Sequence, residues 1–216
     1  MVETATGLVL RTRPLTETSL IVHWLTAGFG RLATVAKGAF RLKSPFRGKL
    51  DVFYLADFTF VRSQRSELHA LREVNLRQTH NMLRRELACL QQAAYCARLI
   101  EQVTETETPL TAIFELMSGV LNELQLRPVQ PRTILAFELK LLDELGLQPD
   151  FAESRLNPGT RQVARTLTDT DWPTLAQLNL SEKQVLELGQ FLHGFLIYHL
   201  GRMPKGRERA LETANA

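Results

Sequence analysis

The chain has 216 residues, which is long enough for one large domain or two small ones. Hydrophobic residues make up 44% of the chain and charged residues 23%, as in ordinary globular proteins. No apolar run approaches the ~20 residues that a membrane helix needs, so a membrane-spanning protein is excluded. The N-terminal residues carry neither a basic n-region nor an A-x-A-like cleavage site, and we therefore expect a cytoplasmic protein.

Acidic and basic residues are distributed unevenly along the chain. Residues 1–80 contain 12 Lys and Arg against 6 Asp and Glu, whereas residues 81–201 contain 10 against 15. A basic first part suggests a polyanionic partner, and the acidic second part suggests a different one.

Short β-rich runs separated by turn residues occupy the first third of the chain. We predict five strands, at residues 6–13, 19–26, 31–38, 50–62 and 68–76. Five short strands in some 70 residues fit a closed barrel of the OB type, with an SH3-like barrel as the alternative. The predicted fold class is α+β, with an OB-fold domain at residues 1–79 followed by an all-α helical domain at residues 80–216.

The segment between the third and fourth predicted strands is the strongest candidate for a binding site. Phe40 and Phe46 alternate there with bases, and no acid occurs in residues 30–50. The six bases are Arg31, Lys37, Arg41, Lys43, Arg47 and Lys49. Such a loop can follow a phosphate backbone while its rings stack on unpaired bases. The alternative interpretation is a solvated charged face with both rings folded back onto the barrel.

Two further bases, Arg11 and Arg13, lie two apart on the first predicted strand and therefore project from the same face. We expect them to extend the cationic surface onto the wall of the barrel. The predicted DNA-binding set thus has eight members.

From residue 80 onward the apolar residues recur with helical spacing, and the first long helix is predicted to run through residues 80–103. Thr108 and Pro109 are a good N-cap and first-turn pair for a second helix that ends near Leu126. Pro131 opens a third helix, with Gly146 placed as its C-terminal cap. Ser181 and Gln184 form a capping box before a last helix at 182–200, and the basic tail beyond it is predicted to be polar and frayed.

The third helix is the candidate partner site of the helical domain. Its cations Arg132 and Lys140 lie beside apolar residues that include Phe137, a mixture that suits an acidic peptide with an apolar tip. An apolar stripe at helical spacing is also typical of a core, with flanking cations in solvent.

No catalytic motif can be placed in the sequence, so we predict that the protein is not an enzyme. The five histidines are scattered, and no cofactor or metal is expected. Cys89 and Cys96 are seven residues apart on a helix, about 10 Å between Cα atoms, which is too far for a disulfide. We expect both to be buried thiols.

The stretch GLVLRTRPLTETSLIVHWLTAGFGRLATVAKGAFRLKSPFRGKLDVF resembles the opening of the bacterial RecO recombination mediator family. The shared features are R-x-R-P-x-x-E-T-S-L at 11–20, G-R-x-x-x-V-A-K-G at 30–38 and the basic loop that follows. Weaker similarity continues at 136–151 and 200–208. Some family members carry a four-cysteine zinc motif after the third helix, but residues 147–160 contain no cysteine here.

The resemblance implies a DNA repair and recombination mediator that binds single-stranded DNA, anneals complementary strands and helps to load recombinase onto DNA coated by single-stranded DNA-binding protein. It implies contacts to that coating protein's acidic C-terminal tail through the helical domain, and RecR, sometimes RecF, as partners. It places the protein in the cytoplasm with the nucleoid. The alternatives from other classes are an OB-fold RNA-binding module and a protein adaptor with a basic face.

Overall fold

A computed structural model describes residues 1–212 and divides the chain into two compact units. The barrel unit comprises Met1–His80 together with Thr104–Glu115. The helical unit comprises Asn81–Val103 and the described residues from Leu116 onward. The division predicted after residue 79 did not anticipate that the segment Thr104–Glu115 would pack with the barrel.

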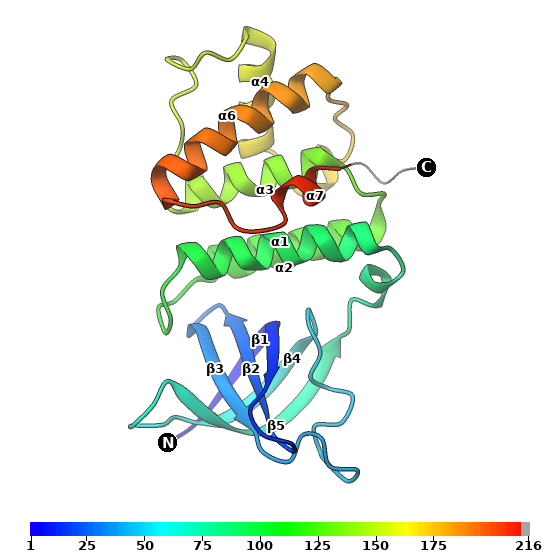
Figure 1. The fold of residues 1–216 in the computed structure, drawn as a ribbon, viewed down its shortest axis with the longest axis vertical. Helices are drawn as coiled ribbons and strands as arrows, with labels where there is room; N and C mark the ends of the chain where they lie inside the picture. The colour runs from blue at the N-terminus through cyan, green and yellow to red at the C-terminus, as the bar shows by residue number, and fades with distance from the viewer. Residues whose placement is uncertain (213–216) are drawn as a thin grey trace. The chain divides into compact units, whose positions relative to one another are not determined.

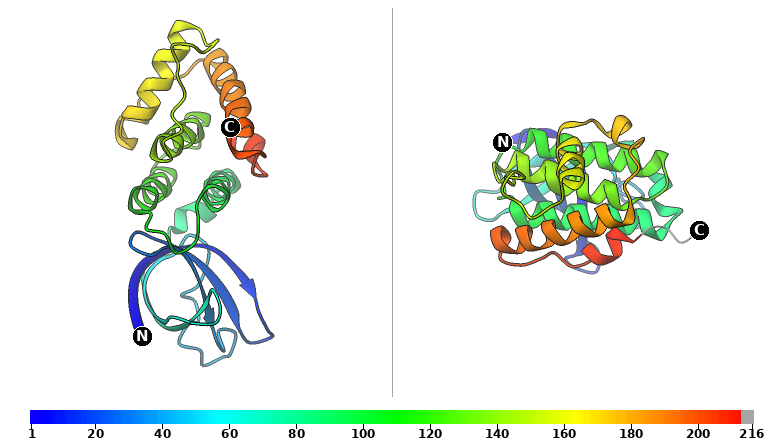
Figure 2. Two further views of the ribbon diagram at one scale, coloured as in Figure 1. Left: turned by 90° about the vertical axis from the view of Figure 1, so that its left-hand side faces the viewer. Right: turned by 90° about the horizontal axis from the view of Figure 1, so that it is seen from above.

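The strands of the barrel unit are β1 (Val2–Pro14), β2 (Leu20–Thr26), β3 (Gly30–Ala36), β4 (Leu55–Val61) and β5 (Leu68–Gln78). They close into a barrel in the order β1-β2-β3-β5-β4, which Figures 1 and 2 show as a ring of curved strands. β1 pairs antiparallel with both β2 and β4, and β3 pairs in parallel with β5. The predicted closed five-stranded barrel is confirmed.

Aromatic side chains fill the barrel. The Trp24 and Phe58 rings stack with centroids 4.1 Å apart, and Phe60 packs beside Phe58. The indole Nε1 of Trp24 donates a 2.8 Å hydrogen bond to the Thr34 hydroxyl, so that its polar atom is satisfied inside the core. The alternation of buried residues along β3 and β4 follows the period of two that one-sided burial requires.

The segment Thr104–Glu115 is held to the barrel by backbone and side-chain contacts. Arg31 donates from Nε to the Thr104 hydroxyl at 2.7 Å, and the Leu110 amide donates to the Ala27 carbonyl at 2.9 Å. Gly30 has φ +64, and a Cβ there would lie 1.7 Å from the Thr108 carbonyl oxygen. Only glycine therefore permits this close approach. The Thr108–Pro109 pair belongs to this segment and does not cap a helix, because the second helix begins at Thr111.

A short 3₁₀ turn and a series of helices follow the barrel in the chain, and Figure 1 labels most of the helices. Their bounds are η1 (Asn81–Arg84), α1 (Leu87–Val103), α2 (Thr111–Leu126), α3 (Pro131–Glu144), α4 (Pro158–Asp169), α5 (Trp172–Leu175), α6 (Glu182–Leu200) and α7 (Arg207–Leu211). The second helix begins in the barrel unit and continues in the helical unit. α3 is the central element, since it contacts α1, α4, α6 and α7. Its apolar residues join those of α4 and α6 in one core.

Several predicted helix boundaries agree with the structure. The capping box of Ser181 and Gln184 is present at the start of α6, and Gly146 adopts φ +68 directly after α3. Both cysteines are buried, as predicted. No described helix is long and apolar enough to cross a membrane.

Two predicted segments need correction. The fourth strand begins at Leu55 and not at residue 50, because Phe53 turns the chain with φ +64 while its amide donates to the Val9 carbonyl. The tail was predicted to be frayed, but Arg207–Leu211 form α7, with Arg207 buried. Residues 213–216 lie outside the described part of the chain.

A buried ion pair fixes α7 against α3. Arg207 donates from Nε and Nη2 to the two carboxylate oxygens of Glu138 at 2.7 and 2.8 Å, and the Tyr95 hydroxyl donates to the same carboxylate. Glu138 is completely buried and Arg207 is 6% exposed. Burial and the neighbouring carboxylate raise the pKa of Tyr95, so its hydroxyl keeps the proton that it donates.

Replacing one partner of this pair leaves the other charge buried without compensation. We expect Arg207→Met to lower the free energy of unfolding by about 3–5 kcal/mol. The double variant Glu138→Leu/Arg207→Met is expected to recover most of this loss, because it removes both charges. Urea denaturation followed by circular dichroism measures both variants. Equal losses in the single and double variants would contradict this account.

Candidate nucleic-acid interface

The cationic loop, which we define as residues 37–54, connects β3 to β4 and is anchored to the barrel at several points. Phe46 is 6% exposed and belongs to the barrel core. The Phe40 amide donates to the Thr18 carbonyl at 3.2 Å, and Lys49 Nζ donates to the Val74 carbonyl at 3.0 Å. Successive turns, two of them at glycines with positive φ, fold the chain between these anchors. The loop consequently has a defined course despite having no strand or helix.

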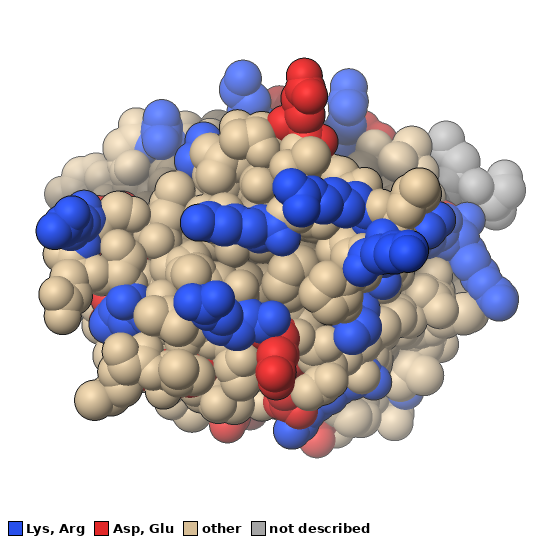
Figure 3. Space-filling model, turned by 90° about the horizontal axis from the view of Figure 1, so that it is seen from below, with Lys and Arg blue, Asp and Glu red and all other residues tan. Residues whose placement is uncertain are grey.

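The structure separates the eight predicted DNA-binding residues into two groups. Two of them, Arg31 and Lys49, are half-buried and donate to backbone or hydroxyl oxygens within the barrel unit. The other six are exposed: Arg11, Arg13, Lys37, Arg41, Lys43 and Arg47. Figure 3 shows a face of the molecule on which Lys and Arg side chains are widespread and Asp and Glu are few.

Two cations elsewhere on the barrel are paired with carboxylates, whereas Arg65 and Arg72 are exposed. Arg62 forms ion pairs with Glu3 and Glu107, and Arg77 pairs with Asp57 at 2.6 Å. The Arg62 and Thr6 hydrogen bonds lower the pKa values of Glu3 and Asp57, respectively, so both carboxylates are ionised at neutral pH. Arg62 and Arg77 therefore contribute little net positive charge, and the positive potential of this unit comes from the exposed six together with Arg65 and Arg72.

The two rings of the cationic loop take opposite positions. Phe46 points into the core, whereas Phe40 is 53% exposed and its neighbour Leu42 is 82% exposed. A pocket of about 310 Å³ lies among Phe40, Phe46, Arg41 and Arg47. Of the two rings considered for stacking, Phe40 alone presents a surface to solvent.

His23 lies on β2 opposite Arg11 and was not predicted as part of the site. Burial, and to a smaller extent the charges of Arg11, Arg13 and Arg31, lower its pKa to about 4. His23 is therefore neutral throughout the physiological pH range. Alternation within the two strands does not indicate this, because the placement of His23 opposite Arg11 depends on the register between β1 and β2.

The three residues predicted to bind a partner peptide do not share an exposed surface. Phe137 is completely buried in the helical unit. Arg132 donates to the carbonyls of Leu178 and Ala176, and Lys140 donates to the Thr168 carbonyl at 2.6 Å. Burial lowers the pKa values of both cations, against the attraction of nearby carboxylates. Peptide binding by α3 stays a prediction, and its cations already stabilise the fold.

The cysteines and potential metal ligands offer no reactive centre in the described residues. Desolvation raises the pKa values of Cys89 and Cys96, which keeps both thiols protonated. Within residues 1–212, no three His, Cys, Asp or Glu side chains come together in an arrangement that could hold a metal ion.

A closed five-stranded barrel with a cationic loop, followed in the chain by a helical unit, defines an OB-fold protein with an appended all-α region. Sequence models of known families match both parts. "Recombination protein O N terminal" matches residues 1–80, and "Recombination protein O C terminal" matches residues 84–155. The chain belongs to the RecO family.

Curated relatives carry the name DNA repair protein RecO. The protein from Rhodopirellula baltica is 33% identical over 143 residues, which cover 66% of this chain and 53% of the relative. The protein from Alkaliphilus metalliredigens is 32% identical over 144 residues, covering 66% and 58%. That from Myxococcus xanthus is 29% identical over 153 residues, covering 71% and 62%. The matched region thus spans less than two thirds of these relatives.

The pKa of His23 predicts how stability depends on pH. Its folded value of about 4 lies below the ordinary value of 6.5, so the unfolded state binds a proton first as the pH falls. The contribution of neutral His23 to the free energy of unfolding is fully present above pH 6.5 and is lost as the pH falls from 6.5 to 4. We expect the free energy of unfolding to fall by roughly 1–3 kcal/mol less between pH 7 and pH 4 in His23→Gln than in the wild type. Denaturation of both proteins at pH 7 and pH 4 measures it, and parallel pH profiles would contradict the assignment.

Proposed function

We propose that this protein binds single-stranded DNA through the cationic loop and the outer face of β1. The observation that carries the proposal is the set of six exposed cations on the barrel unit, with the exposed ring of Phe40 among them. Carboxylates neutralise Arg62 and Arg77, whereas Arg13, Lys37, Arg41, Lys43 and Arg47 form no ion pair within residues 1–212. Phosphate groups are suitable partners for such cations.

Binding of this kind depends on charge and not on base sequence. Each phosphate neutralised on a single strand contributes about −0.7 to the slope of log affinity against log salt. With all six exposed cations in contact, the slope would be about −4. Arg31 and Lys49 add little to this number, because their donors are directed to Thr104 and Val74 inside the unit.

Phe40 supplies the preference for unpaired bases. A ring that is half exposed beside a pocket of about 310 Å³ can stack on a base that is free of its complement. Bases in a duplex are already stacked and offer no face to the ring. The same loop would therefore hold a strand by its phosphates and keep at least one base accessible.

Family membership supports a wider role for the complete protein, as a mediator of DNA repair and recombination. In this proposal the protein anneals complementary strands and helps to load recombinase onto coated DNA, without catalysis. Charge neutralisation lowers the repulsion between two strands, so annealing needs no nucleotide hydrolysis. The proposed partners are RecR, sometimes RecF, and the acidic tail of single-stranded DNA-binding protein on the helical unit. Cytoplasmic and nucleoid location is part of the same proposal.

Reversing three charges of the cationic loop tests the DNA site. We expect Arg41→Glu/Lys43→Glu/Arg47→Glu to weaken single-strand binding at low salt by more than tenfold, and to reduce the magnitude of the salt slope by about 2, because three phosphate contacts are lost. Fluorescence anisotropy of a labelled oligonucleotide across a salt series measures both quantities.

The matched control is Arg155→Glu/Arg165→Glu/Lys183→Glu, which changes the net charge equally at exposed positions of the helical unit. It should retain the wild-type slope. Equal effects of the two triple variants would show that net charge alone governs binding, and the loop assignment would fail. Tighter binding to RNA of the same sequence would favour the RNA-binding alternative, and no binding of either polymer would favour the adaptor.

The ring of Phe40 is tested separately from the charges. We expect Phe40→Ala to weaken single-strand binding by ~1–3 kcal/mol with no change in the salt slope, since stacking is lost and phosphate contacts remain. Leu42→Ala, at an even more exposed neighbouring position, is the control and should have a smaller effect. Anisotropy with single-stranded and duplex probes measures both variants. An equal loss on the duplex would rule out stacking on an unpaired base.

A further inference from the structure

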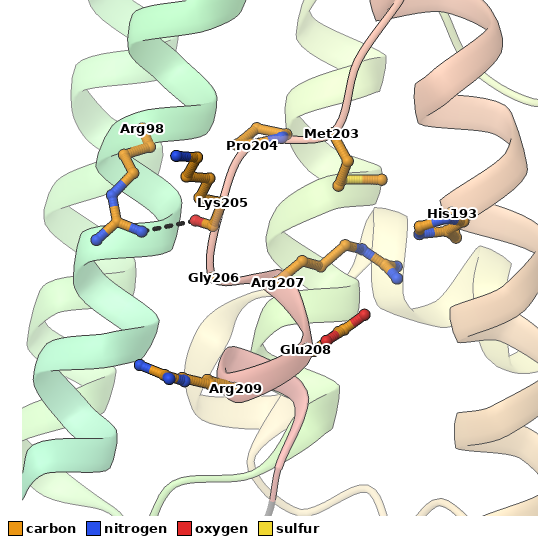
Figure 4. Close-up of a pocket in the computed structure, with 9 residues that line it drawn as sticks. All are labelled: Arg98, His193, Met203, Pro204, Lys205, Gly206, Arg207, Glu208 and Arg209. Carbon is orange, nitrogen blue, oxygen red and sulfur yellow. Dashed lines mark hydrogen bonds between the residues drawn. The ribbon is translucent and has the colours of Figure 1, made fainter.

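A basic pocket in the helical unit has no place in the function proposed for the barrel. It measures about 480 Å³, within the range of small-molecule sites. Arg98 of α1, His193 of α6 and residues 203–209 line it (Figure 4). The surrounding sequence is acidic, since residues 81–201 contain 15 Asp and Glu against 10 Lys and Arg. A cationic recess in an acidic unit therefore calls for its own explanation.

The wall of the pocket is built by side chains of α1 that hold the segment 202–210 by its backbone. Gln102 donates to the Arg202 carbonyl at 2.7 Å, Arg98 to the Lys205 carbonyl at 2.6 Å, and Gln92 to the Ala210 carbonyl at 2.7 Å. These three donors lie along one helix and bind carbonyls spaced along the segment. The segment is consequently fixed in place along its length.

Gly206 lets the segment approach Arg98 closely. It has φ +97, and a Cβ at this position would lie 2.7 Å from Arg98 Nη1. Figure 4 shows Arg98 extending from α1 toward the segment and Arg209 extending from the segment toward α1. Glycine thus allows the guanidinium to lie against the backbone at the pocket wall.

The charges of the pocket do not cancel. Glu138 neutralises Arg207, so Arg207 shapes the pocket but adds no net charge to it. Arg98, Lys205 and Arg209 are exposed, and Glu208 is the one acid among the residues that line the pocket. None of these three cations forms an ion pair in the described part of the chain. Three cations against one carboxylate leave an excess of about two positive charges.

We propose that this pocket binds a phosphomonoester, the terminal phosphate of a nucleotide, free or at the end of a nucleic-acid strand. A phosphomonoester carries about −1.5 to −2 charges at neutral pH, which matches the excess charge of the pocket. Arginine guanidinium groups bind its oxygens in bidentate fashion. A continuous phosphodiester backbone fits less well, because the acidic residues of the rest of the unit would repel it.

An acidic peptide is the competing ligand for this pocket. Met203 and Pro204 are the only apolar side chains that line the pocket, and Pro204 is buried. The accessible surface of the pocket is nevertheless more apolar than polar, so apolar area does not separate the two ligands. The excess of positive charge is the property that favours the phosphomonoester.

The test uses the full chain and oligonucleotides that differ only at their ends. Single strands of one sequence, phosphorylated at the 5′ end, at the 3′ end or at neither, are compared by anisotropy with the label kept internal. We expect one phosphorylated form to bind about tenfold more tightly than the unphosphorylated strand. A deoxynucleoside monophosphate should compete for this added affinity, and its own binding, measured by calorimetry, separates a free nucleotide from a strand end as the source.

The diagnostic variant is Lys205→Gln/Arg209→Gln, which removes two charges and keeps the backbone carbonyl that Arg98 binds. It should lose both the end-phosphate advantage and nucleotide binding, while Arg165→Gln/Lys183→Gln, exposed cations outside the pocket, should retain them. The barrel variant Arg41→Glu/Lys43→Glu/Arg47→Glu should still bind the mononucleotide, so failure of the barrel proposal is distinguishable from failure of this one.

Three results would overturn the assignment. The first is that the end-phosphate advantage and mononucleotide binding are both absent from the wild type. The second is that they survive unchanged in Lys205→Gln/Arg209→Gln. The third is that an Asp- and Glu-rich peptide binds at these residues when phosphate compounds do not, since the ligand would then be a protein segment.

Discussion

The closure of the barrel through β1 is the constraint on which the candidate interface depends. β1 is 13 residues long and forms hydrogen bonds with β2 along one part of its length and with β4 along another. A register shift between Val9 and Arg11 lies in its pairing with β2, and the chain beyond it places Arg11 and Arg13 on the outside. Because the strands on both sides of the cationic loop belong to the closed sheet, the two ends of the loop are fixed in space.

The side chain of Phe46 anchors the long cationic loop to the barrel and so gives it a defined course. An 18-residue loop without secondary structure carries a large entropic cost for any ordered arrangement of its charges. Phe46 offsets part of that cost by burying its ring in the barrel core, and Lys49 adds a bond to the backbone of β5. The exposed cations of the loop are therefore held on a defined backbone before any ligand arrives, which lowers the ordering cost of binding.

The sequence predicted what local patterns specify and missed what depends on distant side chains. Alternating strands, the Ser181 capping box and Gly146 are encoded by neighbouring residues, and the structure has each of them. The docking of Thr104–Glu115 on the barrel arises from contacts with Arg31, Gly30 and Ala27 and has no periodic signature. Arg31 and Thr104, for example, are 73 residues apart in the chain. The burial of Arg207 likewise follows from Glu138, which looks like an ordinary helix carboxylate when the sequence is considered alone.

The same distinction explains why counting cations overestimates a binding surface. Arg31, Lys49, Arg132, Lys140 and Arg207 all stand in basic or amphipathic patterns, yet each donates to oxygen atoms of its own unit. A guanidinium or ammonium that satisfies buried carbonyls gains little by exchanging them for a phosphate, because the carbonyls would then lose their partner. A cation is available to a ligand only where the backbone carbonyls near it already have other hydrogen-bond donors. The cationic loop meets this condition through its turns. In the basic pocket, Gln92, Arg98 and Gln102 of α1 hold the backbone, so Lys205 and Arg209 are the cations that remain for a ligand.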